Sequence, residues 1–366
     1  MKQVGVLGGG QLGRMLALAG YPVGLHFRFL DHAPQSSAAD VGELIVAEFE
    51  DSAALDQFAE DLDVVTYEFE NVPVSAVVHL AKRLPVYPPA EALIASQDRL
   101  TEKTFLRDLS IPTAQFAPVS STAELDAAAA TLGHPSILKT RLMGYDGKGQ
   151  VRLIRKEDHP AALEAIGSTS AILEAVVPFE RELSLLVARS VSGELAYYAL
   201  TENHHEEGIL RKSIAPAPGL APALQQLSEQ YGRAIVEKLN YVGVLAIEFF
   251  QLGDQLMVNE IAPRVHNSGH WTIEGAETSQ FENHLRAILD LPLGSPRARG
   301  TSVMVNCIGE MPGMATCLRV QGLHYHSYGK ASRPGRKVGH LTMCCATETA
   351  AREALQILEQ TVAGAT

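Results

Sequence analysis

The stretch "RLMGYDGKGQ", Arg141–Gln150, decides how the rest of this chain is interpreted. It places glycines at positions 144, 147 and 149 around an aspartate and Lys148, between two strand-like runs. A Walker loop would need the order G-x-x-x-x-G-K-[ST] between a strand and a helix, so this spacing argues against one. Glycines let the backbone approach a ligand closely, and the lysine adds positive charge. The stretch predicts a flap over phosphate groups, with a plain hairpin turn as the alternative. Lys139, which ends the run "SILK" just before the flap, is placed to reach the same phosphates.

A second stretch, "VLAIEFFQLGDQLMVNEIAPR", predicts a β-hairpin that carries carboxylates. Two apolar runs flank "QLGD", which puts Gly253 in the turn. Counted outward from that turn, Glu248 and Glu260 fall on one face. Glu248 has apolar neighbours, and burying a carboxylate is costly unless it is paired or bound to a metal. With Asn259, the pair predicts a Mg²⁺ site shared with substrate phosphates. The alternative is a pair of edge glutamates that face water.

The chain opens with a glycine loop, "VGVLGGGQLGRML", Val4–Leu16. Gly8, Gly10 and Gly13 spell G-x-G-x-x-G between a strand-like run and a helix-like run, and Asp31 ends the next apolar run. That is the outline of a dinucleotide site. However, free N–H groups at a helix N-terminus bind any anion, so the loop does not distinguish a pyrophosphate from a single phosphate. A tight turn without a ligand is the remaining alternative.

The pattern of elements predicts an α/β and α+β protein of three domains. Strands and helices alternate up to about residue 95, which is typical of a parallel, doubly wound sheet. A helix follows over 96–109, with Ser96 as its N-cap. The next part is rich in strands and interrupted by two helices, over 221–240 and 277–291. After the turn-rich "PLGSPRARG", a small β unit ends in a helix. We expect domains over 1–98, 99–294 and 295–366.

Composition and charge exclude several classes of protein. The chain has 366 residues, 46% of them hydrophobic, and a net charge of −12. Nucleic-acid binding is disfavoured because phosphate contacts need clustered Lys and Arg. No run is long and apolar enough for a membrane span, and the start lacks the layout of a signal peptide. The four cysteines form no C-x-x-C, so we expect reduced thiols and a cytoplasmic location.

Two further polar stretches are candidates for substrate contact. In "RVHNSGHWTIEG", His266 and His270 are four apart, but Ser268-Gly269 breaks a helix there and no H-E-x-x-H occurs, so zinc is disfavoured. Trp271 in the same stretch is expected to be structural. The stretch "YGKASRPGRKVGH" gathers basic residues, which form either a solvated turn or a clamp for phosphate or carboxylate. His204 and His205 are ambiguous, since histidines in a loop are more often surface residues than ligands.

In their order along the chain, these pieces resemble an ATP-grasp ligase. The strings "GGGQLGRM", "SQDRLTEK", "KTRLMGYDGKGQ", "NEIAPRVHNSGHWT" and "RPGRKVGH" resemble the N5-carboxyaminoimidazole ribonucleotide synthetases, and the match runs from about Val4 to the end. The resemblance implies a doubly wound N-terminal domain, a central ATP-grasp domain and a small β-rich C-terminal domain. It implies that ATP and bicarbonate are used, with Mg²⁺, to carboxylate 5-aminoimidazole ribonucleotide in purine biosynthesis, and that the enzyme is a homodimer.

The resemblance also implies residue roles. Glu174 and Val177 would lie near the adenine and Glu182 near the ribose. Asp146 would act as a base or an orienting group near the substrate amine. The implied ATP contacts are Arg99, Lys139, Gly144, Tyr145, Asp146, Gly147, Lys148, Gly149, Gln150, Glu174, Ala175, Val176, Val177, Glu182, His205, Asn259 and Glu260. The implied Mg²⁺ ligands are Glu248, Glu260 and Asn259. The implied substrate contacts are Gly10, Gln11, Leu12, His266, Asn267, Ser268 and His270, and the implied catalytic residues are Tyr145, Asp146, Lys330, Arg336 and Lys337.

Three alternatives remain open at this point. A formate-dependent glycinamide ribonucleotide transformylase would share the ATP-grasp class. A nicotinamide-dependent dehydrogenase would rest on the glycine loop and Asp31 alone, whereas the resemblance assigns the loop to a substrate ribose phosphate. A nucleotide-binding regulator without activity is the third. One departure from the family is Met143, a position where glycine is usual.

Overall fold

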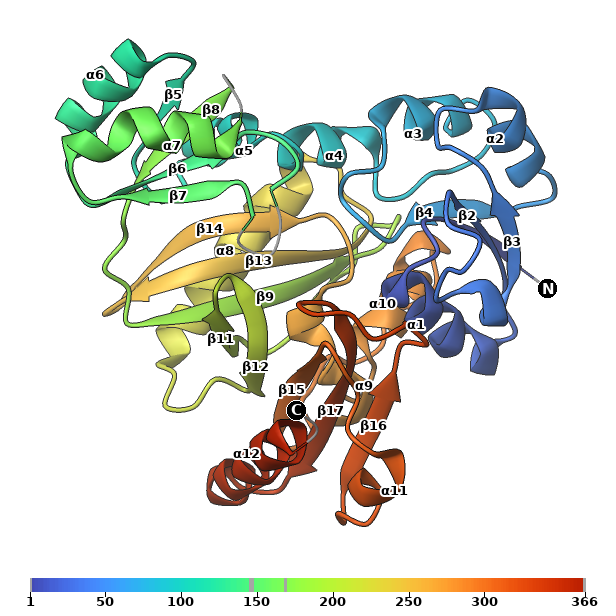
Figure 1. The fold of residues 1–366 in the computed structure, drawn as a ribbon. Coiled ribbons are helices and arrows are strands. Elements are labelled where there is room, and N and C mark those ends of the chain that lie inside the picture. The colour runs from blue at the N-terminus through green and yellow to red at the C-terminus, as the bar shows by residue number, and fades with distance from the viewer. Residues whose placement is uncertain (1, 145–147, 168–169, 365–366) are drawn as a thin grey trace.

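The computed structural model describes residues 2–144, 148–167 and 170–364. The predicted roles of Tyr145, Asp146 and Gly147 fall outside these residues and stay predictions. These described residues form three sheets. Figure 1 shows the first domain beside a long central sheet, with a small sheet above the central one.

The first domain is the predicted parallel sheet. Its strand order is β3-β2-β1-β4, and every pairing is parallel. Apolar side chains of β1 and β2, among them Val4, Val6 and Phe29, are fully buried, as expected when helices cover both faces of a parallel sheet. The strands are β1 (Gln3–Leu7), β2 (His26–Asp31), β3 (Glu43–Val46) and β4 (Val64–Tyr67), and the helices are α1 (Gln11–Gly20), α2 (Ser52–Phe58) and α3 (Val74–Leu80).

Two helices, not one, connect this domain to the next. These are α4 (Ala90–Ser96) and α5 (Arg99–Asp108). The prediction that Ser96 caps the second helix was wrong, because Ser96 ends α4 and its hydroxyl donates to the carbonyl of Ala92. Asp98 is the N-cap of α5, and its Oδ1 accepts from the amides of Leu100 and Thr101 at 2.9 and 3.2 Å. A carboxylate at this position also favours the positive end of the helix dipole.

A small antiparallel sheet of order β5-β8-β6-β7 carries the flap. The flap joins β6 to β7, and Lys139 pairs with Gln150 across its base, which confirms the predicted placement between two strands. The prediction of only two helices in this part of the chain was wrong, because two more cover this sheet. One is rich in alanine and the other has eight residues, so neither has a clear amphipathic pattern. The elements are β5 (Phe116–Val119), β6 (Ser136–Thr140), β7 (Gln150–Leu153), β8 (Ala171–Ala175), α6 (Thr122–Leu132) and α7 (His159–Ile166).

The central sheet has the order β14-β13-β9-β11-β12-β15-β17-β16, with β10 beside β9. Its last three strands come from the C-terminal part, so that part extends the central sheet through the β12–β15 pairing (Figure 1). The strands are β9 (Arg181–Arg189), β10 (Leu195–Tyr197), β11 (Thr201–Glu206), β12 (Ile209–Ala215), β13 (Gly243–Leu252), β14 (Gln255–Ala262), β15 (Thr301–Ile308), β16 (Leu323–Ser327) and β17 (Lys337–Cys345). The helices are α8 (Pro222–Lys238), α9 (Thr272–Gly275), α10 (Gln280–Ile288), α11 (Met314–Cys317) and α12 (Glu348–Ala363). Within the described residues, none of these or the earlier helices has both the length and the apolar composition of a membrane span.

His284 of α10 joins the first domain to the central sheet. Its side chain is fully buried, and the amide of Val244 on β13 donates to its Nδ1 at 3.1 Å. Its Nε2 therefore carries the proton and donates to the hydroxyl of Thr66 on β4 at 2.8 Å. Burial lowers the pKa of His284 to about 3.

We expect this histidine to weaken the fold in acid. Because its pKa is depressed from 6.5, the unfolded chain binds the proton more tightly, so its contribution is complete above pH ~6.5 and is lost as the pH falls toward 3. At pH 5 the loss from this group is ~2 kcal/mol. His284→Gln keeps an acceptor for Val244 and a donor for Thr66 without the titration. Free energies of unfolding at pH 7 and pH 5 should therefore differ less for the variant, and equal differences in both proteins would contradict the prediction.

Candidate active site

The β13–β14 hairpin brings two carboxylates face to face. Glu248 pairs with Glu260 in the strand register, and Gly253 lies in the turn with φ 59°, which confirms the predicted hairpin. The register shifts directly after Glu248, so that Asn259 is an extra residue on β14. A bulge of this kind changes the direction of side chains on its strand. Glu248, Asn259 and Glu260 therefore come together at one place on the sheet.

The electrostatics of this pair favour a bound cation. Burial, and then the charge of Glu260, raise the pKa of Glu248 to about 7. Glu260 is itself 3.4 Å from the guanidinium of Arg99. In the part of the chain that the structure describes, no three His, Cys, Asp or Glu side chains are grouped to hold a metal ion. Two carboxylates and an amide fit Mg²⁺, which keeps water and phosphate oxygens in the rest of its shell.

A buried ion cluster lies next to the flap. Lys139 on β6 donates to Oε2 of Glu174 on β8 at 2.8 Å, and Lys103 on α5 is 3.8 Å from the same oxygen. Burial opposes the ionisation of Glu174, but the two lysines lower its pKa to about 2. Its other oxygen, Oε1, is buried and has no hydrogen-bond partner among the described residues. This arrangement combines positive charge for phosphates with a buried acceptor for a donor group of a ligand.

Lys103 was not singled out from the sequence. Its side chain is 1% exposed, and its ammonium donates to the carbonyl of Asn259 at 2.6 Å and to the hydroxyl of Thr113 at 3.0 Å. It therefore ties α5 to the bulge that carries the carboxylates. The signal was present in "SQDRLTEK", since Lys103 is four residues after Arg99 and four-residue spacing places both on one helix face.

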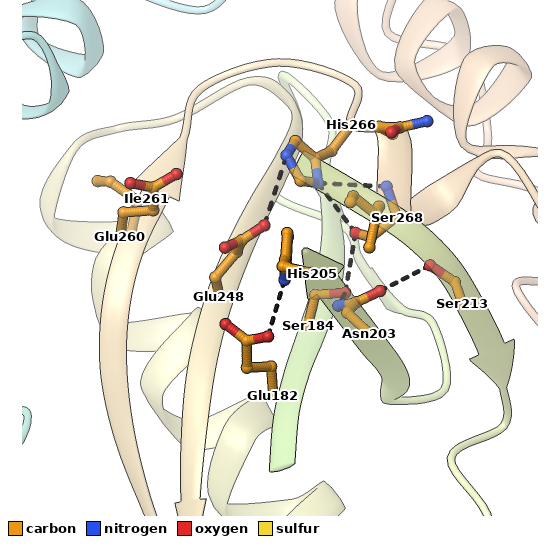
Figure 2. A network of polar contacts seen from close by, with 12 residues as sticks. Glu182, Ser184, Asn203, His205, Ser213, Glu248, Glu260, Ile261, His266 and Ser268 are labelled. Carbon is orange, nitrogen blue, oxygen red and sulfur yellow. Dashed lines mark hydrogen bonds and ion pairs between the residues drawn. The ribbon is translucent and has the colours of Figure 1, made fainter. Parts of the chain in front are cut away.

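His205 belongs to a strand, so the loop assumed for His204 and His205 was wrong, although His204 is exposed as expected of a surface residue. Both lie on β11, and His205 Nδ1 is 2.8 Å from Oε2 of Glu182 on β9. Burial opposes protonation of His205, but the bond to Glu182 and the charge of Glu248 raise its pKa. Figure 2 shows Glu182 and His205 close to Glu248 on the hairpin. The structure thus joins a predicted ATP contact to the predicted metal site.

Backbone amides of the glycine loop in the first domain are hydrogen-bonded to carboxylates of the same chain. The carboxylate of Glu68 accepts from the amides of Gly10, Leu12 and Gly13 at 2.8, 3.1 and 3.2 Å, and Asp31 accepts from the amide of Gly9 at 2.6 Å. The free amides on which a dinucleotide site depends are therefore already bonded. The predicted role of Gly10 and Leu12 in substrate contact stays a prediction. Contact through their amides would require that Glu68 release them.

The basic C-terminal loop meets the glycine loop. The ammonium of Lys330 donates to the side-chain oxygen of Gln11, so two predicted substrate residues from opposite ends of the chain lie together. Arg336 donates to the carbonyl of Ala331 within its own loop at 3.3 Å, and Lys337 begins β17. A half-buried ion pair links Glu70 of the first domain to Arg264, which follows the hairpin. Neither residue was assigned a role from the sequence.

The predicted substrate contacts in the loop after β14 lie partly at the site and partly in the core. His266 Nε2 is 3.7 Å from Oε1 of Glu248. Asn267 exchanges amide hydrogen bonds with Asn306 at 2.7 and 3.0 Å. His270 is 1% exposed and its ring packs at a tilt against that of His340, so it lies in the core. Trp271 is fully buried and donates to the hydroxyl of Thr201 at 2.9 Å, which confirms its structural role.

Three family models match the chain in succession. The ribonucleotide synthetase preATP-grasp domain matches residues 1–97, the ATP-grasp domain residues 104–281, and the phosphoribosylaminoimidazole carboxylase C-terminal domain residues 302–354. Together with the flap, the buried lysines and the paired carboxylates, these matches define the class of the protein as an ATP-grasp ligase.

Similar proteins with known names identify the family to which this chain belongs within that class. The N5-carboxyaminoimidazole ribonucleotide synthase of Pseudomonas aeruginosa is 53% identical over 344 residues, which cover 94% of this chain and 95% of the relative. The crystal structure of the N5-carboxyaminoimidazole ribonucleotide synthetase from Thermus thermophilus is 57% identical, with a TM-score of 0.94 over 98% of each chain. The Aspergillus clavatus enzyme, in complex with ADP and 5-aminoimidazole ribonucleotide, is 34% identical with a TM-score of 0.92 over 99% of each chain. This chain belongs to the N5-carboxyaminoimidazole ribonucleotide synthase family, which confirms the predicted fold and resemblance, and the glycine loop does not mark a nicotinamide enzyme.

Proposed function

We propose that this chain uses ATP and bicarbonate to convert 5-aminoimidazole ribonucleotide to N5-carboxyaminoimidazole ribonucleotide. The observation that carries the proposal is the pairing of Glu248 with Glu260 beside the Lys139–Glu174 cluster and the flap. A site for paired carboxylates and a site for phosphates then meet in one place, which phosphoryl transfer requires. The names of the relatives supply the substrate.

The reaction begins with attack of a bicarbonate oxygen on the γ-phosphorus of ATP, which releases ADP and leaves carboxyphosphate. Carboxyphosphate breaks down to CO₂ and phosphate, and the exocyclic amine of the ribonucleotide adds to CO₂ and loses a proton to give the carbamate. Lys139 and Lys148 would hold the phosphate oxygens, and closure of the flap would exclude water that destroys the intermediate. Asp146 would orient the amine or accept its proton. Mg²⁺, held by Glu248, Glu260 and Asn259, would neutralise charge on the phosphates.

The nucleotide would lie against the small sheet. The orphaned Oε1 of Glu174 supports this placement, because a buried acceptor without a partner is stabilised by a ligand donor such as the adenine amino group. Arg99 would contact the phosphates, and Glu182 with His205 would contact the ribose. Of the other implied ATP contacts, Ala175 ends β8, and Val176 and Val177 follow it directly.

Product analysis with ¹³C-bicarbonate tests the proposal. Mass spectrometry should detect the acid-labile, ¹³C-labelled carbamate only when ATP and 5-aminoimidazole ribonucleotide are both present. Formate with glycinamide ribonucleotide serves as the second arm. A formylated product in that arm, without carbamate in the first, would replace the proposal by the transformylase alternative.

Lys330→Met should raise the KM for 5-aminoimidazole ribonucleotide. Lys330 contacts Gln11 where the two predicted substrate regions meet, and loss of a charge-assisted contact to an anionic substrate is expected to raise KM by about 10-fold. The KM for ATP should not change. Steady-state kinetics with each substrate varied in turn measure both values. Lys82→Met, an exposed lysine of the first domain, is the control, and an unchanged KM for the ribonucleotide in Lys330→Met would remove Lys330 from the substrate site.

Two further expectations belong to the proposal. The family resemblance implies a homodimer, and light scattering on the purified protein measures the oligomeric state. All four cysteines are free in the structure, which supports the proposed reducing, cytoplasmic location.

A further inference from the structure

A chain of buried polar side chains crosses the central sheet and ends at His266 (Figure 2). It starts at Ser213 on β12 and continues through Asn203 on β11 and Ser184 on β9 to Ser268. All four residues are at most 5% exposed. Polar groups at this depth are costly unless they are bonded, so a continuous chain of them calls for an explanation.

The direction of the hydrogen bonds at Asn203 follows from the chemistry of the groups, and geometry makes Ser184 the donor to Ser268. Asn203 Oδ1 can only accept, so the hydroxyl of Ser213 donates to it at 2.7 Å. Asn203 Nδ2 can only donate, and it donates to the hydroxyl oxygen of Ser184 at 2.9 Å. Ser184 has one proton, which it gives to the hydroxyl oxygen of Ser268 at 2.8 Å. The hydroxyl proton of Ser268 is then available for a hydrogen bond to its other neighbour.

That neighbour is the imidazole of His266. Nδ1 of His266 is 2.9 Å from the hydroxyl oxygen of Ser268, and the backbone amide of Ser268 points to the same nitrogen at 3.4 Å. Two donors on one ring nitrogen require that this nitrogen has no proton. A neutral histidine in this environment therefore carries its proton on Nε2. Nε2 faces Oε1 of Glu248 at 3.7 Å, which is longer than a direct hydrogen bond.

We propose that the chain Ser213–Asn203–Ser184–Ser268 fixes the tautomer of His266, so that its Nε2–H is held as a donor toward Glu248 and the substrate. Ser213, Asn203 and Ser184 are then positioning residues, since they act through His266 and do not reach the site. The backbone of His266 is held as well, because the side chain of Gln280 bonds its amide at 2.9 Å and its carbonyl at 2.6 Å. A donor fixed in tautomer and position need not reorganise when charge develops on an oxygen of the substrate. The role of the Nε2–H toward the substrate rests on the proposed function, whereas the assignment of the tautomer does not.

The tautomer can be measured directly by NMR. In protein labelled with ¹⁵N-histidine, the ring signals of His266 are assigned by their loss in His266→Gln. The proposal predicts an unprotonated Nδ1 and a protonated Nε2 in the wild-type protein. In Ser184→Ala the hydroxyl oxygen of Ser268 loses its donor and can accept from Nδ1–H, so the signals should shift toward a mixture of tautomers. A protonated Nδ1 in the wild-type protein would overturn the proposal.

Kinetic measurements then distinguish a positioning role of Ser184 from a purely structural one. Ser184→Ala should lower kcat by about 3- to 10-fold, the worth of one net hydrogen bond, with the KM for ATP unchanged. Ser228→Ala is the matched control, because Ser228 is equally buried and, among the described residues, its hydroxyl bonds only the carbonyl of Gln225 in its own helix. It should change neither kcat nor the signals of His266.

The outcomes are distinguishable from failure of the proposed function. Wild-type kcat in a Ser184→Ala protein whose tautomers are mixed would overturn the positioning role, even if carboxylation of the ribonucleotide is confirmed. Absence of that carboxylation in the wild-type protein would overturn the proposed function, while the NMR spectrum would still decide whether the chain fixes the tautomer.

Discussion

Glu260→Gln is expected to abolish most of the turnover while leaving the fold intact. Glutamine has nearly the same volume as glutamate, so the β13–β14 register with Glu248 should persist. The substitution removes one of two opposed carboxylates, and with it the attraction for Mg²⁺ and the contact to Arg99 at 3.4 Å. We expect kcat/KM for ATP to fall by about 100-fold or more, which is ~2.7 kcal/mol of transition-state stabilisation.

The measurement is AIR-dependent ADP formation (AIR, 5-aminoimidazole ribonucleotide) at several Mg²⁺ concentrations, with circular dichroism as the check on folding. Asp254→Asn is the matched control, since this exposed carboxylate lies in the turn of the same hairpin. It should leave both turnover and the Mg²⁺ requirement unchanged. Wild-type turnover of Glu260→Gln at ordinary Mg²⁺ would remove Glu260 from the metal site.

Lys103→Met is expected to cause the largest loss of stability. The lysine is 1% exposed, and its ammonium bonds Thr113 and the carbonyl of Asn259 and faces Glu174. Methionine fills a similar volume but removes the ammonium that donates to Thr113 and Asn259, and it leaves Glu174 with Lys139 alone of the two lysines. Removal of one partner from a buried ionic cluster costs about 3–5 kcal/mol. Activity should fall as well, because Asn259 lies in the bulge between the two carboxylates.

Denaturant unfolding of the wild type and the variant measures the free energy of unfolding. Lys82→Met, an exposed lysine, is again the control and should change the free energy of unfolding by less than about 0.5 kcal/mol. A comparable, small change in Lys103→Met would show that the buried ammonium does not hold the cluster together.

The features that the sequence predicted correctly are those with a local signal. The hairpin of Glu248 and Glu260 follows from two apolar runs around one turn, whereas the bulge at Asn259, which brings the two carboxylates opposite each other, has no such local signal. The placement of the glycine-rich stretch between two strands follows from its flanking apolar runs, and the parallel sheet follows from regular alternation of strands and helices. Each of these depends on residues close together in the chain.

The features that the sequence missed depend on distant residues or on competition between neighbours. Glu68 fills the glycine loop from 55 to 58 residues away, and Ser184 meets Ser268 across 84 residues, so no local pattern reveals either contact. Ser96 and Asp98 are both good caps, and only the observed start of α5 selects Asp98. His205 lies in a polar strand, where the apolar alternation that identifies strands is absent.

The most direct test of the whole account is ADP formation by the wild-type protein with Mg²⁺-ATP, measured with and without bicarbonate and 5-aminoimidazole ribonucleotide. We expect strong stimulation of ADP formation by the ribonucleotide, which disappears when bicarbonate is removed. ADP formation that does not respond to the ribonucleotide would contradict the proposed function.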